Sequence, residues 1–241
     1  MTVSCIDISH HQGSGIDFEL VRESGVVAMI HKASEGTSMV DDMRASNIIA
    51  ASKENIVCCT YHWISPGSDP VEQMKHYLNT VQPVRGERLV IDYEQEGCTI
   101  GQLKEAVQYL MDQKRDFQIT VYSGHLLKEQ IGGARDEFLA KNTDLWLAQY
   151  NDDPDEITWP DETYATWTLW QYSETGKIPG IKDEYVDLNQ FNGSDTELVR
   201  WMAPRGRRPP APQPEEEGVK VEISVPSGTE VTVIVNGEEW T

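Results

Sequence analysis

Two carboxylates directly follow an apolar run in the segment Leu89-Val90-Ile91-Asp92-Tyr93-Glu94. The run predicts a strand buried on both faces, as in a parallel sheet covered by helices. Alternate residues of a strand point to the same side, so Asp92 and Glu94 are expected on one face, about 6–7 Å apart. Neighbouring carboxylates repel each other, which keeps one of them protonated to higher pH and able to act as a general acid. Taken alone, such a pair is more often a solvated strand end.

Short apolar runs alternate with helical patterns along most of the chain. This alternation predicts an α/β fold of parallel strands joined by right-handed crossovers. The predicted strands span residues 3–8, 26–31, 56–62, 88–92, 118–122, 145–149, 166–171 and 185–188. The predicted helices span residues 17–24, 41–54, 69–81, 100–115, 124–131 and 194–202. Eight strands favour a closed (β/α) barrel over an open sheet, with an irregular second half where the connections are too short for full helices.

The chain divides into a barrel over residues 1–204, a proline-rich and acidic linker over 205–218, and a small β-strand extension over 219–241. In the extension, residues 219–225 and 230–235 alternate apolar and polar residues around a turn, which predicts a β-hairpin. A further short strand is expected after Asn236-Gly237. A unit of this size is too small to form a stable hydrophobic core of its own. It is therefore expected to dock on the barrel, on a second copy of the chain or on a partner.

The charge of the chain restricts its partners. Its 241 residues carry a formal net charge of −20. Such a surface repels phosphate backbones and anionic bilayers, which argues against nucleic-acid binding and membrane insertion. The N-terminal residues lack the basic and apolar regions of a signal peptide, and no segment has membrane-spanning length. The four cysteines lack CxxC spacing, so reduced thiols are expected rather than a zinc site, and the chain is expected to be made and kept in a cytoplasm.

Polar and aromatic side chains gather where the predicted strands end. In a (β/α) barrel these ends share one rim, which carries the active site. The candidates are Asp7, Lys32, Glu35, Tyr61, Asp92, Glu94, Tyr122, Trp146, Tyr150, Trp170, Gln171 and Asp187. Carboxylates ringed by aromatic faces suit sugars, and glycoside hydrolysis requires a protonated acid and a group that stabilises the oxocarbenium ion. No Ser-His-Asp order, phosphate-binding glycine loop or metal-spaced histidine cluster competes in the sequence, so no metal or cofactor is expected.

Five motifs in register resemble the family 25 glycoside hydrolases, which are lysozymes of the N-acetylmuramidase type. The motifs are Ile6-Asp7-Ile8-Ser9-His10-His11-Gln12-Gly13, Lys32-Ala33-Ser34-Glu35-Gly36, Tyr61-His62-Trp63, Asp92-Tyr93-Glu94 and Val186-Asp187-Leu188-Asn189. The match spans residues 3 to about 202. The resemblance implies a flattened, irregular TIM-like barrel that cleaves the β-1,4 bond between N-acetylmuramic acid and N-acetylglucosamine in peptidoglycan.

The resemblance also assigns roles. Glu94 matches the general acid, and Asp92 matches its partner, which orients the 2-acetamido group of the substrate. Asp7 and Asp187 match the two further acids of the site. The remaining candidates are expected to bind substrate: Tyr61 and Glu35 from the resemblance, and Lys32, Tyr122, Trp146, Tyr150, Trp170 and Gln171 from their places near strand ends. The chain departs from the family at His11, where many members carry Trp, and at Cys58-Cys59-Thr60, where small residues are usual.

Several functional alternatives stay open at this point. Substrate assistance by the 2-acetamido group would retain the anomeric configuration, whereas a water between the carboxylates would invert it. The leading hypothesis is a phage endolysin that stays in the host cytoplasm until lysis and then cuts peptidoglycan glycan strands. The alternatives are a virion structural or attachment protein that carries a lysozyme domain, a non-catalytic glycan binder, and a glycosidase that acts on chitin.

Overall fold

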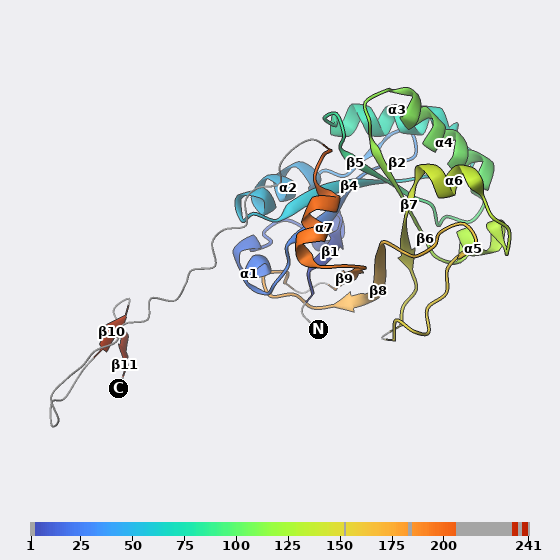
Figure 1. Cartoon of the computed structure of the whole chain (residues 1–241). Coiled ribbons are helices and arrows are strands. Elements are labelled where there is room, and N and C mark those ends of the chain that lie inside the picture. Colours follow the sequence, from blue (N-terminus) through green and yellow to red (C-terminus); the bar gives the residue numbers. More distant parts are fainter. Residues whose placement is uncertain (1–2, 152, 183–184, 206–232, 236–237, 241) are drawn as a thin grey trace. The chain divides into compact units, whose positions relative to one another are not determined.

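The computed structural model of the chain describes residues 3–151, 153–182, 185–205, 233–235 and 238–240. The chain separates into two compact units, Met1–Pro209 and Pro210–Thr241 (Figure 1). In the second unit, β10 (Val233–Val235) pairs in antiparallel fashion with β11 (Glu238–Trp240), the short strand expected after Asn236-Gly237. The predicted strand over residues 219–225 lies outside the described residues. The predicted linker and its boundaries remain a prediction.

The first unit is a closed eight-stranded barrel, as predicted. Its sheet runs in the order β1-β9-β8-β7-β6-β5-β4-β2, and pairing of β1 with β2 closes the ring. These strands are β1 (Cys5–Ile8), β2 (Ala28–Glu35), β4 (Val57–Trp63), β5 (Arg88–Asp92), β6 (Gln118–Ser123), β7 (Asp144–Ala148), β8 (Leu169–Gly176) and β9 (Val186–Phe191). A two-residue strand that the sequence pattern did not predict, β3 (Met39–Val40), adds to the edge of β2.

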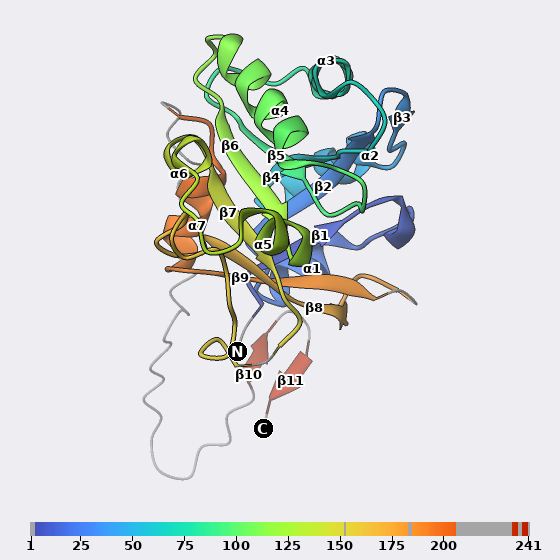
Figure 2. The ribbon, with the colours of Figure 1, turned by 90° about the vertical axis from the view of Figure 1, so that its right-hand side faces the viewer.

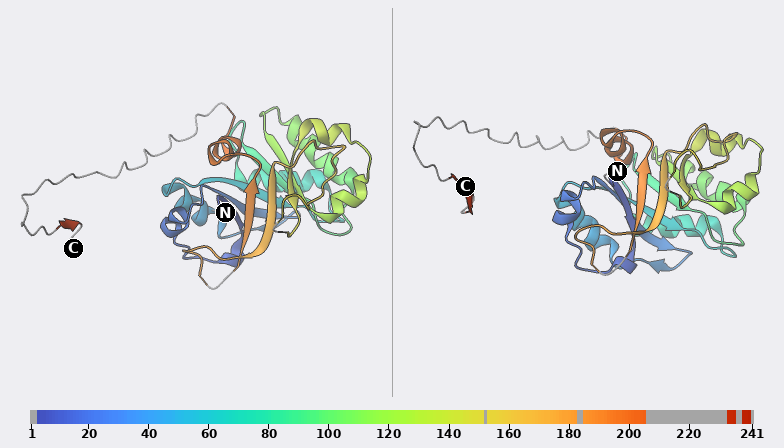
Figure 3. Two further views of the ribbon diagram at one scale, coloured as in Figure 1. Left: turned by 60° about the horizontal axis from the view of Figure 1, so that its bottom comes forward. Right: turned by 90° about the horizontal axis from the view of Figure 1, so that it is seen from below.

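The prediction of parallel strands throughout is wrong for β9. This strand pairs in antiparallel fashion with both β8 and β1 (Figure 3, the adjacent yellow and orange strands). The cause is the connection between β8 and β9, which spans only residues 177–185 and contains no helix in its described part. Without a crossover helix the chain returns beside β8 in the opposite direction. The barrel is therefore mixed, and β9 begins at the rim where the other seven strands end.

Helices cover the outside of the barrel. They are α1 (Phe18–Glu23), α2 (Arg44–Lys53), α3 (Pro70–Val81), α4 (Ile100–Asp112), α5 (His125–Ile131), α6 (Glu137–Asn142) and α7 (Asp195–Met202). The pattern did not predict α6. Figures 1 and 2 show α3 and α4 side by side over the sheet. On α4 the buried residues are Leu103, Ala106, Val107 and Leu110. Their spacing of three and four places them on one face of the helix, and this face packs on the strands.

The barrel interior forms a core of its own. Ile30, Val90, Trp146 and Leu169 are buried there, and α7 adds Met202 to the same cluster. The four cysteines are unpaired, three of them buried and Cys58 half-buried. Within the described residues, no helix is long and apolar enough to cross a membrane.

Candidate active site

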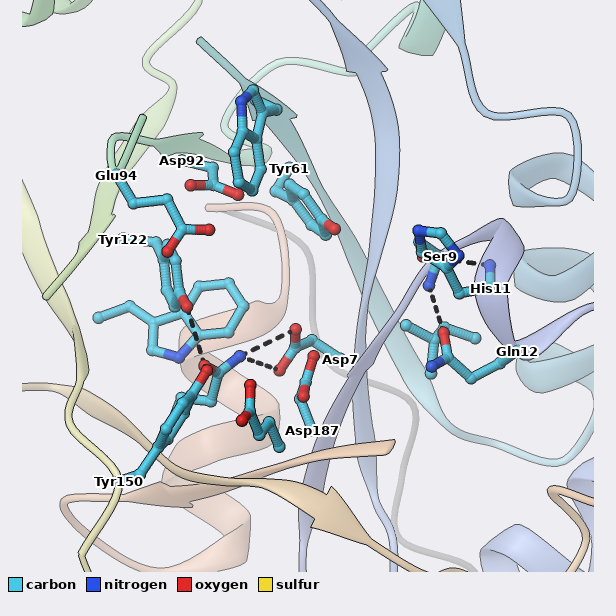
Figure 4. A pocket seen from close by; sticks show the side chains of 15 residues that line it. Asp7, Ser9, His11, Gln12, Tyr61, Asp92, Glu94, Tyr122, Tyr150 and Asp187 are labelled. Carbon is cyan, nitrogen blue, oxygen red and sulfur yellow. Dashed lines mark hydrogen bonds between the residues drawn. The ribbon is translucent and has the colours of Figure 1, made fainter. Parts of the chain in front are cut away.

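A cavity of about 180 Å³ opens at the rim where the parallel strands end. Figure 4 shows the side chains that line it. They are Asp7, Ile8, Ser9, His11, Gln12, Tyr61, Trp63, Asp92, Glu94, Tyr122, Trp146, Tyr150, Gln171, Glu174 and Asp187. Nine of the twelve candidates from the sequence are in this group, among them all four acids. No group of three or more His, Cys, Asp or Glu residues in the described chain is arranged to hold a metal ion.

Strand β5 delivers the two carboxylates that its sequence predicts. Asp92 is the last residue of the strand, Glu94 follows two positions later, and both line the cavity. Tyr93 between them is fully buried, and its hydroxyl donates to Gln130 Oε1 at 2.7 Å. The Tyr93 carbonyl also accepts a hydrogen bond from the Ser123 hydroxyl at 2.5 Å. These contacts fix the backbone between the carboxylates, so both are held toward the cavity.

Asp92 is a buried acid without a hydrogen-bond partner at one oxygen. Its side chain is 4% exposed, and Oδ1 has no partner within the described residues. Burial raises the pKa of Asp92 well above its ordinary value, and the charge of Glu94 raises it further. An unpartnered buried oxygen is costly to the fold. The arrangement therefore leaves an acceptor ready for a substrate N–H or O–H.

Glu94 has the acidity of a general acid that works near neutral pH. Partial burial raises its pKa from 4.5 to about 7, and the charge of Asp187 adds to the increase. Lys32 acts in the opposite direction. A catalytic acid is most effective when its pKa lies near the working pH, because it is then both protonated and able to release the proton. Glu94 meets this condition.

Asp7 and Asp187 form a carboxyl pair across two antiparallel strands. They are directly opposite in the register of β1 and β9, and Figure 4 shows them facing each other. Burial raises the pKa of Asp7 to about 6, although hydrogen bonds from Asn189 (2.7 Å) and Gln171 (3.0 Å) lower it. Burial and the charge of Asp7 raise the pKa of Asp187 to about 8. The two carboxyl groups repel each other when both are ionised, so they lose their protons in two steps that belong to the pair as a whole.

The aromatic wall of the cavity is tied together by hydrogen bonds. Tyr122 packs edge-on against Trp146, with ring centroids 4.6 Å apart. The Tyr122 hydroxyl donates to Gln171 Oε1 at 2.8 Å, and the Tyr150 hydroxyl donates to the same oxygen at 3.3 Å. The Trp146 indole donates to Asn189 Oδ1 at 2.7 Å. This wall presents ring faces beside the acids, an arrangement suited to sugar rings.

The sequence matches the family described as Glycosyl hydrolases family 25 over residues 6–181. The chain belongs to this family. Lysozyme M1 of Streptomyces globisporus is 28% identical over 214 residues, which cover 82% of this chain and 70% of that protein. The crystal structure of a bacterial lysozyme from Streptomyces coelicolor superposes with a TM-score of 0.73 at 26% identity, covering 84% of this chain and 97% of that one. A family GH25 lysozyme from Aspergillus fumigatus gives a TM-score of 0.71 at 25% identity, covering 84% and 100%.

The protein is therefore a glycoside hydrolase of the lysozyme type, and its activity is peptidoglycan hydrolysis. The cavity at the rim, with its four acids and aromatic wall, is the candidate active site of this family 25 hydrolase. The antiparallel strand β9 matters for this site. Asp187 lies near the beginning of β9, not near its end as the sequence pattern implied, and it reaches the rim because β9 starts there.

Three candidates lie outside the lining of the cavity. Trp170 is 2% exposed and packs against Trp167 and Tyr172 in the outer core, and its indole donates to the carbonyl of Gln149. Strand alternation explains this position, because Gln171 next to it points inward. Lys32 and Glu35 form an ion pair at 2.7 Å, and the Lys32 ammonium lies 5.1 Å from the centre of the Trp63 ring. They act on the site through charge and packing.

The structure adds cavity residues that the strand-end rule did not select. Glu174 lies on β8 beyond Gln171, and it reaches the cavity because β8 extends past the rim as an arm paired with β9. Gln12 and Ser9 come from the short 3₁₀ turn η1 (His10–Gln12) and its cap. A signal for this turn was present: Ser9 followed by Gln12 has the spacing of a capping box.

Proposed function

We propose that this family 25 hydrolase is an N-acetylmuramidase in which Glu94 is the general acid. It cleaves the β-1,4 bond between N-acetylmuramic acid and N-acetylglucosamine. The observation that carries the proposal is the placement of Glu94 in the rim cavity beside the buried and unpartnered Asp92, and the raised pKa of Glu94, about 7, agrees with it. A protonated carboxylic acid next to an acceptor oxygen is the pair that glycoside hydrolysis with acetamido assistance requires.

In this mechanism Glu94 donates its proton to the glycosidic oxygen as the bond from that oxygen to the anomeric carbon breaks. The carbonyl oxygen of the 2-acetamido group forms a bond to the same carbon from the opposite face. Asp92 accepts the acetamido N–H at Oδ1, the atom that has no partner within the described residues. Water then opens the ring intermediate with the Glu94 carboxylate as the base, so the anomeric configuration is retained.

Digestion of purified peptidoglycan followed by mass spectrometry tests the proposal. The wild type is expected to release fragments with N-acetylmuramic acid at their reducing ends, and Glu94→Gln is expected to release none. Glu96→Gln is the matched control, because Glu96 is exposed and lies outside the cavity lining. It should keep wild-type activity. Fragments with N-acetylglucosamine at their reducing ends would show that the enzyme cuts the other glycosidic bond. If Glu94→Gln released the same products as the wild type, Glu94 would not be the general acid.

The stereochemical outcome separates the two mechanisms. The proposed route gives the β-anomer as the first product, whereas attack by water between two carboxylates gives the α-anomer. NMR of the products within the first minutes, before mutarotation, distinguishes them. An α-anomer formed first would exclude acetamido assistance and would leave the general-acid role of Glu94 standing.

We further infer that the enzyme acts in host lysis as a phage endolysin, held in the host cytoplasm until the membrane is breached. The free thiols support this setting, since unpaired cysteines persist in a reducing compartment. Expression in a bacterium whose purified wall the enzyme cuts provides the test. We expect lysis only after the membrane is permeabilised. Lysis without permeabilisation would contradict the inference.

A second role is favoured by the separate unit Pro210–Thr241. Small β-units can mediate assembly or attachment, as in a virion protein that carries a lysozyme domain. The full chain would then self-associate through this unit, whereas the chain ending at Pro209 would be a monomer. Size exclusion with light scattering compares the two. A full chain that is monomeric would count against self-association and in favour of a unit that docks elsewhere.

A further inference from the structure

The acids of the cavity are gathered on one side of its polar lining. Five lining residues are carboxylic acids: Asp7, Asp92, Glu94, Glu174 and Asp187. Among the described residues that line the cavity, His11 is the one side chain able to carry a positive charge. In Figure 4, His11 lies across the pocket from Glu94, and Asp7 and Asp187 lie below the path between them. A substrate that reaches from Glu94 across the cavity therefore meets His11.

His11 is held in place by its neighbours. Its ring packs against the ring of His10, with centroids 4.2 Å apart. His10 is fixed by the fully buried Asp41 carboxylate, which accepts from its backbone N–H at 2.8 Å and contacts its ring Nδ1 at 3.0 Å. The backbone N–H of His11 donates to the Ser9 hydroxyl at 3.3 Å. His11 itself is exposed, so its ring nitrogens remain available to a ligand.

The other end of the same turn is also anchored. Gln12 Oε1 accepts from the backbone N–H of Ser9 at 2.9 Å, which completes a capping box. Gln12 Nε2 donates to the carbonyl of Tyr185 at 2.8 Å, so the turn is tied to the segment that leads into β9. Such a turn presents His11 in a fixed position before substrate binds, which lowers the entropy that binding would cost.

We propose that His11 binds the lactyl group of N-acetylmuramic acid through a carboxyl-derived oxygen of that group, which makes it a specificity-determining residue. This inference rests on the proposed muramidase function. Muramic acid differs from N-acetylglucosamine by a lactyl ether that ends in a carboxyl group, either free or amide-linked to the stem peptide. Both forms present an acceptor oxygen. An imidazole donates an N–H in each of its protonation states, so His11 can serve either form.

Within the described lining of the cavity, no side chain other than His11 can offer this group a positive charge. A lactyl carboxylate beside Asp7, Asp187 or Glu174 would be repelled. Lys32 is a cation whose charge acts on Asp92 and Glu94, but it is 8% exposed, pairs with Glu35 and does not line the cavity. A lactyl oxygen is therefore stabilised on the side of His11. This also selects muramic acid over the unsubstituted sugar of chitin.

Three substrates test the proposal: glycan strands stripped of peptide by an amidase, the same strands with the lactyl carboxyl reduced to an alcohol, and intact peptidoglycan. The wild type is expected to show a KM about tenfold lower for the carboxylate strands than for the reduced strands, as a charge-assisted hydrogen bond implies. His11→Ala should raise KM on the carboxylate strands to the value for the reduced strands and leave kcat unchanged. If His11→Ala raises KM by a similar factor on intact peptidoglycan, the contact is with the lactyl carbonyl oxygen. If it raises KM on the free carboxylate strands alone, the contact is with the negative charge of the carboxylate.

Two variants serve as controls. His125→Ala removes an exposed histidine at the start of α5, outside the cavity lining, and should change none of the three KM values. His11→Gln keeps an N–H donor and should keep part of the preference. If His11→Ala raises KM equally on all three substrates, or on none, the proposal is wrong. A wild type inactive on every substrate would instead overturn the muramidase function, so the two failures are distinguishable.

Discussion

The side-chain amide of Gln171 on β8 donates to both carboxylate oxygens of Asp7 on β1, at 3.0 and 3.2 Å, across the intervening strand β9. Its carbonyl oxygen accepts from the hydroxyls of Tyr122 and Tyr150. One buried amide thus fixes an acid and two rings of the aromatic wall. Gln171 lines the cavity but is 2% exposed, so we assign it a positioning role in place of the substrate contact that its strand-end position suggests.

Gln171→Leu should therefore impair catalysis without unfolding the barrel. Loss of two hydrogen bonds to a buried carboxyl group and two to tyrosines implies a decrease in kcat/KM of about 10- to 100-fold. Since the Asp7 carboxyl also loses hydrogen bonds that lower its pKa, the pH profile should change as well. Kinetics on soluble glycan strands across pH measure both effects. Gln108→Leu, on the exposed face of α4, is the matched control and should have the kcat/KM of the wild type. If Gln171→Leu keeps the kcat/KM and pH profile of the wild type, Gln171 has no positioning role.

The pH dependence of the enzyme follows from the pKa of Glu94. The general acid is active when protonated, so kcat/KM should fall as pH rises through about 7. The charge of Asp187 raises this pKa and that of Lys32 lowers it. Asp187→Asn should therefore move the alkaline limb to lower pH, whereas Lys32→Met should move it to higher pH. Profiles of kcat/KM on soluble strands measure both, and shifts in the same direction would show that Glu94 does not govern the limb.

Asp92 should decrease the stability of the enzyme at neutral pH. The pKa of Asp92 is raised in the folded state, so folding disfavours the ionised form. At low pH the carboxyl group is protonated in both states and costs no stability. As pH rises above about 4 it ionises in the unfolded state first, and the folded state becomes less stable relative to it. Asp92→Asn removes the charge and should raise Tm by about 2–6 °C near pH 8, if about 1–2 kcal/mol is regained. The gain should shrink toward pH 4, while activity is lost. Calorimetry at both values checks this; a gain that is independent of pH would exclude the charge as its cause.

Much of the site could be predicted because a strand alternates its side chains. Asp92 and Glu94 both line the cavity, and buried Tyr93 between them points away, as the spacing requires. The same rule places Gln171 in the cavity lining and Trp170 outside it, although the sequence prediction treated these two neighbours on a strand alike. Local periodicity determines which face a residue occupies, provided that the strand is assigned correctly.

Other features depended on contacts that the local pattern does not contain. The direction of β9 follows from the absence of a crossover helix after β8, and Asp187 reaches the rim for that reason. Glu174 enters the cavity through the length of the β8–β9 arm, which is set by pairing between strands. The bond between Gln171 and Asp7 joins residues 164 positions apart. A sequence pattern read over a few residues cannot predict contacts between residues so far apart in the chain.

Arg88 should stabilise the end of the barrel opposite the active site. It begins β5, is 2% exposed, and donates to Asp144 and Thr120, both at 2.7 Å. Its guanidinium lies 3.8 Å from the centre of the Trp201 ring and donates to the Trp201 carbonyl at 2.8 Å, which fastens α7 to the barrel. Removing this buried group takes a hydrogen-bond donor away from Asp144, Thr120 and the Trp201 carbonyl. Arg88→Ala should therefore cost about 3–5 kcal/mol of folding free energy.

The loss should be one of stability alone, because Asp92 and Glu94 lie at the far end of the same strand. Urea unfolding measures the free energy, and kcat/KM of the folded enzyme at low temperature should stay within about twofold of wild type. Arg85→Ala provides the contrast: Arg85 is exposed and pairs with Asp116 on the surface, so its removal should cost less than about 1 kcal/mol. Equal costs for the two variants would show that burial of Arg88 and its contact with Trp201 add nothing. A large decrease in the activity of folded Arg88→Ala would show instead that the two ends of the barrel are coupled.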